Sequence, residues 1–352
     1  MNLDQFRAKQ TIARILFPVA LLALFFTSAT GWSFSALYAL GDSLSDTGRN
    51  PAPAPSYYNG RYSNGPLWVE YLSAELGLTY NAANNFAVSG DTTSNLASQV
   101  AGVVPSTNLS SALFTVWIAG NDFLDSADIG VNDPAWAVVI SNAVVNITNA
   151  LGTLYTDGAR EIIVGNLPNL GQIPAFVGTP AGYTNYIDSK VALFNTTLAS
   201  ALTSVMQRYP GLRIYPVDFN STFTATLNSP GTYGFTVTTV GALEDTNLTN
   251  KSFTGPGADY LFWDTIHPTT KAHALNAGVA FLSVGVELSS SGNGINSSLV
   301  VSNLSPGLSY TIQSSANLAT WTNYQILTAT SNNATVTVTN ALGANAYYRV
   351  RY

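Results

Sequence analysis

The sequence contains no cysteine in its 352 residues. The chain therefore forms no disulfide, and it lacks the cysteine that a lipid anchor would need. Thiolate sites for zinc and iron–sulfur clusters are excluded for the same reason. Histidine is scarce as well. The two that are present, His267 and His273, leave few candidates for a metal ligand or a general base.

Charged residues are also few. They make up 9% of the chain, against about 25% in an average soluble protein, and the formal net charge is -6. No basic stripe is available to neutralise phosphates, so the sequence argues against a nucleic-acid partner. Hydrophobic residues reach 46%, which suffices for a substantial core in one large domain with a smaller one beside it. Asn, Ser and Thr replace the missing charges, a composition that we associate with exported proteins.

Residues 1–31 have the organisation of a signal peptide. Arg7, Lys9 and Arg14 give a positive start, residues 15–26 form a run of twelve apolar residues, and small residues follow. Twelve apolar residues are too few for a membrane span of about 20. We therefore expect a secreted, periplasmic or extracellular protein with no stable membrane span after cleavage. An uncleaved helix at the membrane interface is the alternative.

Residues 32–288 alternate between short apolar runs and longer amphipathic stretches. Five runs are nearly continuous in apolar residues, which is typical of strands covered on both faces of a parallel sheet. These predicted strands span residues 36–41, 84–90, 113–120, 161–166 and 212–218. The alternation of strands and helices predicts a three-layer α/β domain that binds ligands at the carboxyl ends of its strands.

Two helices are predicted from apolar spacing. Between Ile187 and Val205 the apolar residues recur every three or four positions, which gives one stripe along a helix. A shorter stripe runs from Ala272 to Leu282, and Pro268 fits the first turn of that helix. The long stretch 229–262, rich in Gly and Thr, is interpreted as a loop on the substrate side.

The composition changes near residue 289. Residues 289–294, SSSGNG, are interpreted as a linker. Residues 295–352 contain no acidic residue and include strictly alternating segments, which predicts a small antiparallel, β-sandwich-like module. Trp321 in this module is interpreted as a core residue, with stacking on a sugar ring as the alternative.

Three polar or glycine positions follow the ends of predicted strands. Ser43 comes after the first strand, where the start of a helix would favour developing negative charge. Gly90 either makes a turn with positive φ or exposes its backbone N–H. Asn121 either caps a helix or points its amide at an oxyanion. Asp42 and Asp46, which flank Ser43 closely, are interpreted as turn-stabilising residues.

The segment WDTIHP places Asp264 three residues before His267, directly ahead of a predicted helix. In such a loop His267 can reach a neighbouring site, with Asp264 holding its tautomer and orientation. His273 lies inside the following helix and is interpreted as structural. A metal site is poorly supported, because no third His, Cys or clustered carboxylate accompanies the pair.

Taken together, these motifs resemble the GDSL, or SGNH, family of serine esterases and lipases. The match runs in order through GDSLSDTG with Ser43, NFAVSGDTT with Gly90, GND with Asn121 and DTIHP with Asp264 and His267. Residues 57–73 further resemble the plant-lipase-like branch of the family. The chain departs from that branch at Arg49, which stands between GDSLSDTG and Asn50 and affects the loop beside the nucleophile.

The resemblance implies a flavodoxin-like α/β/α domain that hydrolyses carboxylic esters through an acyl-enzyme. Ser43 would be the nucleophile, His267 the general base and Asp264 its orienting partner. The N–H groups of Ser43 and Gly90 and the Asn121 side chain would form the oxyanion hole. No metal or organic cofactor is implied. The expected substrate is a small-molecule, lipid or carbohydrate ester.

Two other functions stay open at this point. The same acyl-enzyme could be passed to an alcohol or a sugar, which would make the protein an acyltransferase. The chain could also be mainly a binding protein that contacts polysaccharide or a cell surface through its β module, which is similar to short modules at the ends of exported bacterial proteins. Arg61, in NGRYSNG, is interpreted either as a ligand for an anionic substrate group or as a residue that orders its loop.

Overall fold

The fold was analysed in a computed structural model. The structure describes residues 34–103, 109–127, 133–285, 287–291, 296–302, 304, 309–315, 322–331, 334–339 and 347–351. The predicted signal peptide, residues 1–31, and Trp321 lie outside the described residues. The described chain forms two compact units: an α/β unit over residues 34–280 and a C-terminal β unit from residue 281 onward.

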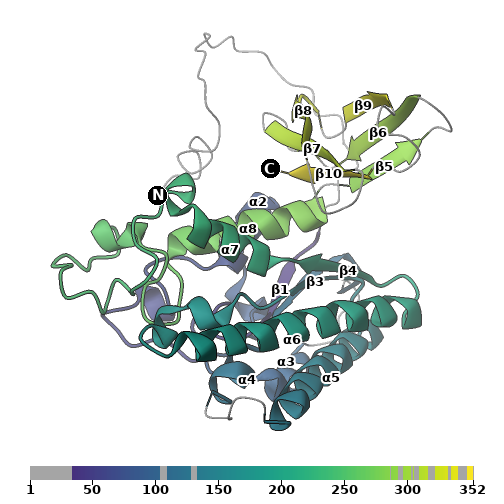
Figure 1. Ribbon diagram of the computed structural model, residues 1–352. Coiled ribbons are helices and arrows are strands. Elements are labelled where there is room, and N and C mark those ends of the chain that lie inside the picture. Colours follow the sequence, from purple (N-terminus) through teal and green to yellow (C-terminus); the bar gives the residue numbers. More distant parts are fainter. Residues whose placement is uncertain are drawn as a thin grey trace. The chain divides into compact units, whose positions relative to one another are not determined.

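The centre of the α/β unit is a parallel sheet of four strands in the order β1-β2-β3-β4 (Figure 1). The strands are β1 (Leu37–Gly41), β2 (Leu113–Trp117), β3 (Glu161–Gly165) and β4 (Arg213–Val217). Every residue of β2 and β3 is buried, as expected for strands covered on both faces. The predicted α/β fold with a parallel sheet is confirmed.

The predicted strand 84–90 is not a strand. Asn85 makes an isolated parallel bridge to Ala39, and Phe86 and Val88 donate to the carbonyls of Ala39 and Gly41. Two other backbone N–H groups of the segment donate to side chains instead of to a strand. The Ala87 N–H donates to Asn85 Oδ1, and the Ser89 N–H donates to Asp46 Oδ2. Counted as a short edge, this segment completes the strand order 2-1-3-4-5 of flavodoxin-like sheets.

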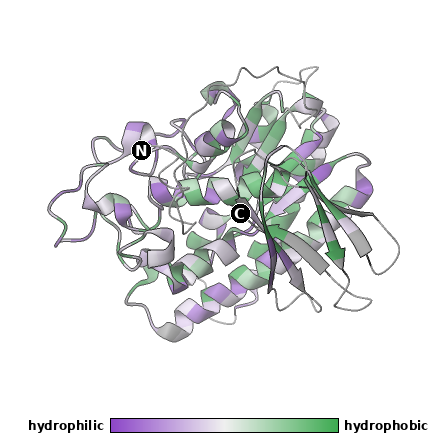
Figure 2. Cartoon of the chain, turned by 90° about the horizontal axis from the view of Figure 1, so that it is seen from above, coloured by the Kyte–Doolittle hydropathy of each residue, from purple (hydrophilic) through white to green (hydrophobic). Residues whose placement is uncertain are grey.

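Helices cover both faces of the sheet. Below it in Figure 1 lie α3 (Leu96–Ala101), α4 (Gly120–Leu124), α5 (Ala135–Thr156) and α6 (Ala181–Arg208). Above it lie α2 (Trp68–Glu75), α7 (Phe219–Asn228) and α8 (Thr270–Gly285). The predicted stripe from Ile187 to Val205 is buried in the core along α6. Figure 2 shows hydrophobic residues concentrated on the strands and on the neighbouring helices.

Short 3-10 helices connect these elements. Their bounds are Tyr58–Gly60, Ala82–Asn84, Thr93–Asn95, Leu109–Ser111, Leu170–Gln172, Pro174–Phe176, Pro230–Tyr233 and Pro256–Asp259. The helix predicted near Pro268 begins at Thr270, two residues later than the sequence indicates. Its first turn is closed by the N–H of His273, which donates to the carbonyl of Thr269, so Pro268 stays in the preceding loop.

Among the described residues, α5 is the one helix whose length and hydropathy would let it cross a membrane. Nine of its residues are nevertheless buried within the α/β unit, including Trp136, Ile140 and Leu151. Packing against the sheet therefore accounts for its apolar character.

The C-terminal β unit contains two antiparallel sheets of three strands, β10-β7-β8 and β5-β6-β9. The strands are β5 (Glu287–Ser291), β6 (Asn296–Ser302), β7 (Ser309–Ser315), β8 (Thr322–Thr328), β9 (Ala334–Thr339) and β10 (Tyr347–Arg351). Apolar side chains of both sheets, among them Val301, Tyr310, Ile312 and Val336, share one buried cluster.

The start of this unit differs from the sequence-based boundary. Residues 289–291, placed in the linker by their serine-rich composition, belong to β5 and pair with residues 298–300 of β6. Backbone hydrogen bonds of a ladder do not require apolar side chains, so a serine-rich segment can pair when a partner strand is at hand. The compact unit itself starts at residue 281, before the predicted boundary at 295.

Candidate active site

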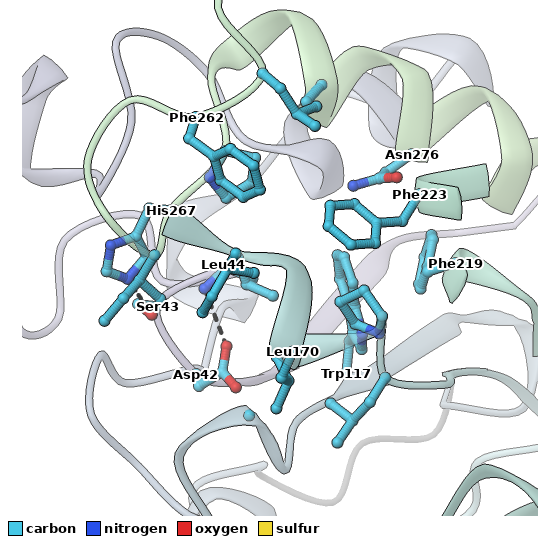
Figure 3. A pocket seen from close by; sticks show the side chains of 18 of the residues that line it. Asp42, Ser43, Leu44, Trp117, Leu170, Phe219, Phe223, Phe262, His267 and Asn276 are labelled. Carbon is cyan, nitrogen blue, oxygen red and sulfur yellow. Dashed lines mark hydrogen bonds between the residues drawn. The ribbon is translucent and has the colours of Figure 1, made fainter. Parts of the chain in front are cut away.

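Three side chains from two distant parts of the chain form one hydrogen-bonded row in the α/β unit. Ser43 Oγ lies 2.8 Å from His267 Nε2 (Figure 3). His267 Nδ1 lies 2.7 Å from Asp264 Oδ2. All three residues are at least 90% buried. The structure therefore brings together the nucleophile, the base and the orienting carboxylate that the sequence analysis named, in the order that nucleophilic catalysis requires.

Asp264 is fixed on every side. Its Oδ1 accepts the N–H groups of Ile266 and His267, both at 2.7 Å, and its Oδ2 accepts the Tyr57 hydroxyl at 2.8 Å as well as His267 Nδ1. Burial raises the pKa of Asp264, but the hydrogen bond and charge of His267 and the two N–H bonds outweigh it, so the pKa lies below its ordinary value. The carboxylate is therefore ionised at neutral pH and holds the imidazole in place.

Ser43 stands in a tight turn directly after β1. The carbonyl of Asp42 accepts the N–H groups of Ser45 and Asp46, which makes a single turn, and the next helix of the chain begins only near Tyr58. The expectation that Ser43 starts a helix is therefore wrong. The Asp46 carboxylate binds the following N–H groups, those of Gly48, Arg49 and Asn50, and so replaces the helical hydrogen bonds.

Gly41 controls how β1 enters this turn. A Cβ on Gly41 would lie 2.3 Å from the carbonyl oxygen of Trp117, so only glycine allows β1 and β2 to approach here. The side chain of Gln99 on α3 holds the same residue from the other side, because its amide accepts the Gly41 N–H and donates to the Gly41 carbonyl. Gln99 also donates to Asp91 and thereby connects β1 to the segment around Gly90.

Gly90 and Asn121 lie on two segments that are joined to each other. Gly90 has a φ of 91°, and a Cβ there would meet no atom within 4 Å, so its conformation and not lack of space requires glycine. Asn121 Nδ2 donates to the carbonyl of Asp91 at 2.8 Å, next to Gly90. In the described part of the chain, the N–H groups of Ser43 and Gly90 donate no hydrogen bond. An asparagine amide has two N–H bonds, so Asn121 also keeps a free one.

The turn into α4 is held by a second pair of contacts. Asp122 accepts the N–H and the hydroxyl of Thr93 at 2.9 and 2.6 Å, which fixes α4 against the segment after Gly90. Ala119, just before α4, has a φ of 103°, a conformation that is uncommon for a residue with a side chain. Backbone strain of this kind persists where the surroundings fix the chain.

The comparison with known families decides the identity of this arrangement. Residues 37–277 match the model of the GDSL-like lipase/acylhydrolase family, which is more than half of the chain. The chain belongs to this family. As a GDSL protein it falls in the class of serine ester hydrolases.

Curated relatives share part or most of its length. The GDSL chain is 34% identical to a phosphatidylcholine-sterol acyltransferase of Aeromonas hydrophila over 41% of its own length and 47% of that protein. It is 24% identical to a GDSL esterase/lipase of Arabidopsis thaliana, covering 70% and 81% of the two chains. It is 27% identical to the thermolabile hemolysin of Vibrio parahaemolyticus, covering 67% and 60%. The chain thus spans about half of the Aeromonas relative.

Solved structures are similar at lower identity. The acetylxylan esterase Axe2 of Geobacillus stearothermophilus aligns with a TM-score of 0.41 and 17% identity, over 72% of this chain and 97% of that one. The hydrolase LAE5, from the metagenome of Lake Arreo, aligns with a TM-score of 0.40 and 19% identity, over 72% and 98%.

The two aspartates beside the GDSL serine have different surroundings. Asp46 accepts five hydrogen bonds in all, including the N–H and hydroxyl of Ser89, so it stabilises the turn as interpreted from the sequence. Asp42 is buried, and from the part of the chain that the structure describes its side chain accepts only the Leu44 N–H, at 3.0 Å. Burial raises the pKa of Asp42 to about 7, although the Leu44 N–H and the charge of His267 lower it. Asp42 therefore carries only part of a negative charge at neutral pH.

The block of residues 57–66 contributes two site residues that the sequence analysis did not name. The Tyr57 hydroxyl donates to Asp264, and the ring of Tyr62 lies 4.7 Å from the ring of His267. The signal was present, because this block carried the resemblance to the plant-lipase-like branch. Gln99 was missed as well, and nothing in its local sequence marks it.

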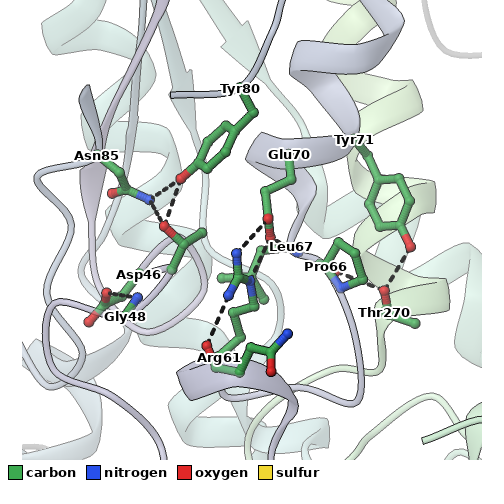
Figure 4. A network of polar contacts seen from close by, with 12 residues as sticks. Asp46, Gly48, Arg61, Pro66, Leu67, Glu70, Tyr71, Tyr80, Asn85 and Thr270 are labelled. Carbon is green, nitrogen blue, oxygen red and sulfur yellow. Dashed lines mark hydrogen bonds and ion pairs between the residues drawn. The ribbon is translucent and has the colours of Figure 1, made fainter. Parts of the chain in front are cut away.

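Two arginines near the site order loops. Arg61 makes a two-pronged ion pair with Glu70, at 2.9 and 2.7 Å, and also donates to the carbonyl of Asn59 (Figure 4). Its guanidinium therefore orders the loop, which is the second of the two interpretations of Arg61 given from the sequence. Arg49, the departure from the family pattern, donates to the Asn85 carbonyl and lies over the ring of Phe86 at 4.7 Å. Asn50 still reaches the carbonyl of Ser89, at 2.7 Å.

His273 is separate from the Ser43–His267–Asp264 row. It is fully buried in α8, and neither ring nitrogen has a hydrogen-bond partner in the described structure. Burial, and to a smaller extent the charge of His267, lowers the pKa of His273 to about 3. It is therefore neutral at physiological pH. Among the described residues no group of three or more His, Cys, Asp or Glu could hold a metal ion.

A pocket opens beside Ser43. Ser43, His267 and Asn121 all line it, and the space between its walls amounts to about 850 Å³ when the part open to solvent is included. Leu261 and Phe262, at the end of the stretch predicted to be a substrate-side loop, form part of its wall. Ser43 and His267 thus stand at the edge of a cavity, with Asp264 behind them.

Proposed function

We propose that the protein is a carboxylic ester hydrolase that works through an acyl-enzyme on Ser43. The observation that carries this proposal is the hydrogen-bonded row Ser43–His267–Asp264 at the edge of the pocket. A serine hydroxyl is a weak nucleophile until a base removes its proton, and His267 Nε2 is within hydrogen-bond reach of it.

The reaction would proceed in two halves. Ser43 Oγ attacks the ester carbonyl while its proton passes to His267, and His267 then gives that proton to the leaving alcohol. Water next attacks the acyl-enzyme, with His267 again taking and returning the proton, and the acid is released. The ionised Asp264 stabilises the imidazolium in both halves.

The negative oxygen that forms in each half needs hydrogen-bond donors. The free N–H groups of Ser43 and Gly90 and the second N–H of the Asn121 amide support an oxyanion hole here. Fixed donors of this kind are effective because they are already oriented before the charge develops. The bonds from the Asn121 amide to the Asp91 carbonyl and from the Thr93 hydroxyl to Asp122 would hold the two segments together during the reaction.

The test is hydrolysis of p-nitrophenyl esters from acetate to palmitate by the purified protein. Ser43→Ala is expected to lose activity by about a thousandfold or more, and an organophosphonate should label Ser43 in the wild type. Ser189→Ala, an exposed serine on α6, serves as the matched control and should keep full activity. Activity that survives in Ser43→Ala would contradict the proposal.

Acyl transfer is the second candidate function. Two observations favour it: the identity with the Aeromonas acyltransferase over 167 residues, and the burial of Ser43 and His267, which limits the access of water. An acceptor alcohol added to the assay separates the two reactions. Transfer yields a new ester at the expense of free acid, whereas pure hydrolysis leaves the acid yield unchanged.

We also propose that the protein is exported. The positive start and the apolar run of residues 1–31 support a cleaved signal peptide. Mass spectrometry of protein recovered outside the cytoplasm of an expressing bacterium should find the mature N-terminus near residue 30 or 32. Recovery of the intact N-terminus in the membrane fraction would instead favour the uncleaved helix.

Contact with polysaccharide through the C-terminal β unit is proposed on a narrower basis. Tyr324 and Ile326 on β8 are exposed, and an exposed tyrosine ring can stack on a sugar. Co-sedimentation with insoluble polysaccharide should weaken in Tyr324→Ala and persist in Asn323→Ala, a neighbouring exposed change. Equal sedimentation of the two variants would reject this surface.

A further inference from the structure

The pocket beside Ser43 is lined mainly by apolar side chains of the α/β unit. Trp117 ends β2, Leu167 and Leu170 follow β3, Phe219 and Phe223 come from α7, and Phe262 closes another side. Figure 3 shows Ser43 and His267 at one end, and Phe219, Phe223 and Asn276 at the other. A compound that enters beside Ser43 therefore meets a deep wall of rings and aliphatic side chains.

The aromatic part of this wall is firmly packed. The rings of Trp117 and Phe219 stack with centroids 3.9 Å apart, and Trp68 of α2 contacts both rings edge-on at 5.5 Å. Phe223 meets Phe262 edge-on at 6.0 Å. A wall supported in this way keeps its shape when empty, so a chain that enters it does not have to order the protein first.

From these observations we infer that the pocket holds an apolar acyl chain and that Asn276 sets its preferred length. This inference rests on the proposed ester hydrolysis. The acyl group becomes bonded to Ser43 in the first half of the reaction and stays in the site until water releases it in the second, whereas the alcohol leaves in the first half. The segments that would surround the carbonyl carbon, Asp42–Leu44 and Gly120–Asn121, also line this pocket, so a chain on that carbon enters it directly.

Asn276 is the residue that limits the length of the acyl chain. It lies on α8, lines the pocket, and its amide makes no hydrogen bond with any residue that the structure describes. While the pocket is empty, water can reach the amide. A hydrocarbon chain long enough to cover it would remove that water and leave the amide unpaired, at a cost of about ten- to a hundredfold in binding.

The expected dependence on acyl length follows from these two effects. Each methylene that enters the pocket should raise kcat/KM by about fourfold. The rise should stop at the length at which the chain reaches Asn276. Replacing the amide by an apolar side chain of similar size should move this break to longer chains, and a larger ring should move it to shorter chains.

The experiment compares kcat/KM for p-nitrophenyl esters from acetate to palmitate, each divided by the value for acetate. Asn276→Leu should raise this ratio for the longest esters by about tenfold or more, and Asn276→Phe should lower it for the medium-length esters. Asn228→Leu and Asn228→Phe change an exposed asparagine on α7 outside the pocket and should keep the wild-type ratios. A second series varies the alcohol of acetate esters from ethyl to decyl. A length dependence confined to the alcohol would overturn the inference.

A binding measurement separates this inference from the proposed function. Calorimetry of Ser43→Ala with decanoate and butyrate needs no turnover. Tighter binding of decanoate, weakened by Asn276→Phe, supports the pocket even if the wild type hydrolyses no ester. Acetate hydrolysis with a flat chain-length series and equal binding of both acids would leave the esterase proposal standing and refute the acyl pocket.

Discussion

His273 gives a direct test of how burial acts on this fold. It is 1% exposed, and both of its ring nitrogens lack a partner in the described structure. Its pKa lies at about 3 in the folded protein, against an ordinary value of 6.5. The unfolded chain therefore binds a proton between about pH 6.5 and pH 3 that the folded chain does not bind.

The sign follows from this difference in protons. Acid favours the state that binds more protons, so the folded state loses stability as the pH falls below 6.5. Between the two pKa values, each pH unit lowers the free energy of unfolding by about 1.4 kcal/mol. At pH 5, about 1.5 units below the pKa of the unfolded chain, His273 should lower the free energy of unfolding by about 2 kcal/mol relative to pH 7.

The variants are His273→Leu and His273→Gln, both of which remove the titration. The free energy of unfolding is measured in urea at pH 7 and pH 5, from the fluorescence of tryptophans that include the buried Trp68, Trp136 and Trp263. Between these pH values the wild type should lose about 2 kcal/mol more than either variant. His273→Leu should also be the more stable variant, since His273→Gln leaves a buried amide unpaired. Equal losses in all three proteins would refute the reasoning.

Two further predictions concern the candidate site. Asn121→Ala removes one of three proposed oxyanion donors and should lower kcat by about a hundred- to a thousandfold. Stopped-flow or steady-state hydrolysis of p-nitrophenyl acetate measures this kcat. A near-wild-type kcat would exclude Asn121 as an oxyanion donor. Gln99→Ala leaves the buried N–H of Gly41 unpaired and should lower the free energy of unfolding by about 1–3 kcal/mol. The exposed change Ser98→Ala should leave the urea midpoint unchanged. An unchanged midpoint in Gln99→Ala would show that the hydrogen bonds between Gln99 and Gly41 are dispensable for stability.

Much of the fold was predictable because its signals are local. The predicted runs at 36–41, 113–120, 161–166 and 212–218 are short, mostly apolar and bounded by breakers, and each contains one of the four strands of the sheet. The stripe along α6 needed only the helical period. Where the prediction was wrong, side-chain hydrogen bonds replaced the expected backbone pairing. Asp46 took the N–H groups that would have started a helix after Ser43, and also the Ser89 N–H that a strand would have used.

The candidate site likewise contains residues that could be predicted from the sequence and residues that could not. Ser43, Gly90 and Asn121 could be named as candidates because they follow the ends of predicted strands, and His267 because only two histidines were available for a base. Tyr57, Tyr62 and Gln99 were missed, since their partners lie far away in the sequence: Tyr57 reaches Asp264 across 207 positions, and Gln99 reaches Gly41 across 58.

The sequence by itself determined the order of the motifs, the apolar strands and the residue types from which a nucleophilic site can be made. Only the tertiary structure decided that Ser43 and His267, 224 positions apart, come within 2.8 Å of each other. It also decided that Trp117, Phe223 and Asn276 enclose one pocket beside them. The physical reason is that local patterns depend on neighbouring residues, whereas a hydrogen bond or a cavity depends on which distant surfaces the packed core brings together.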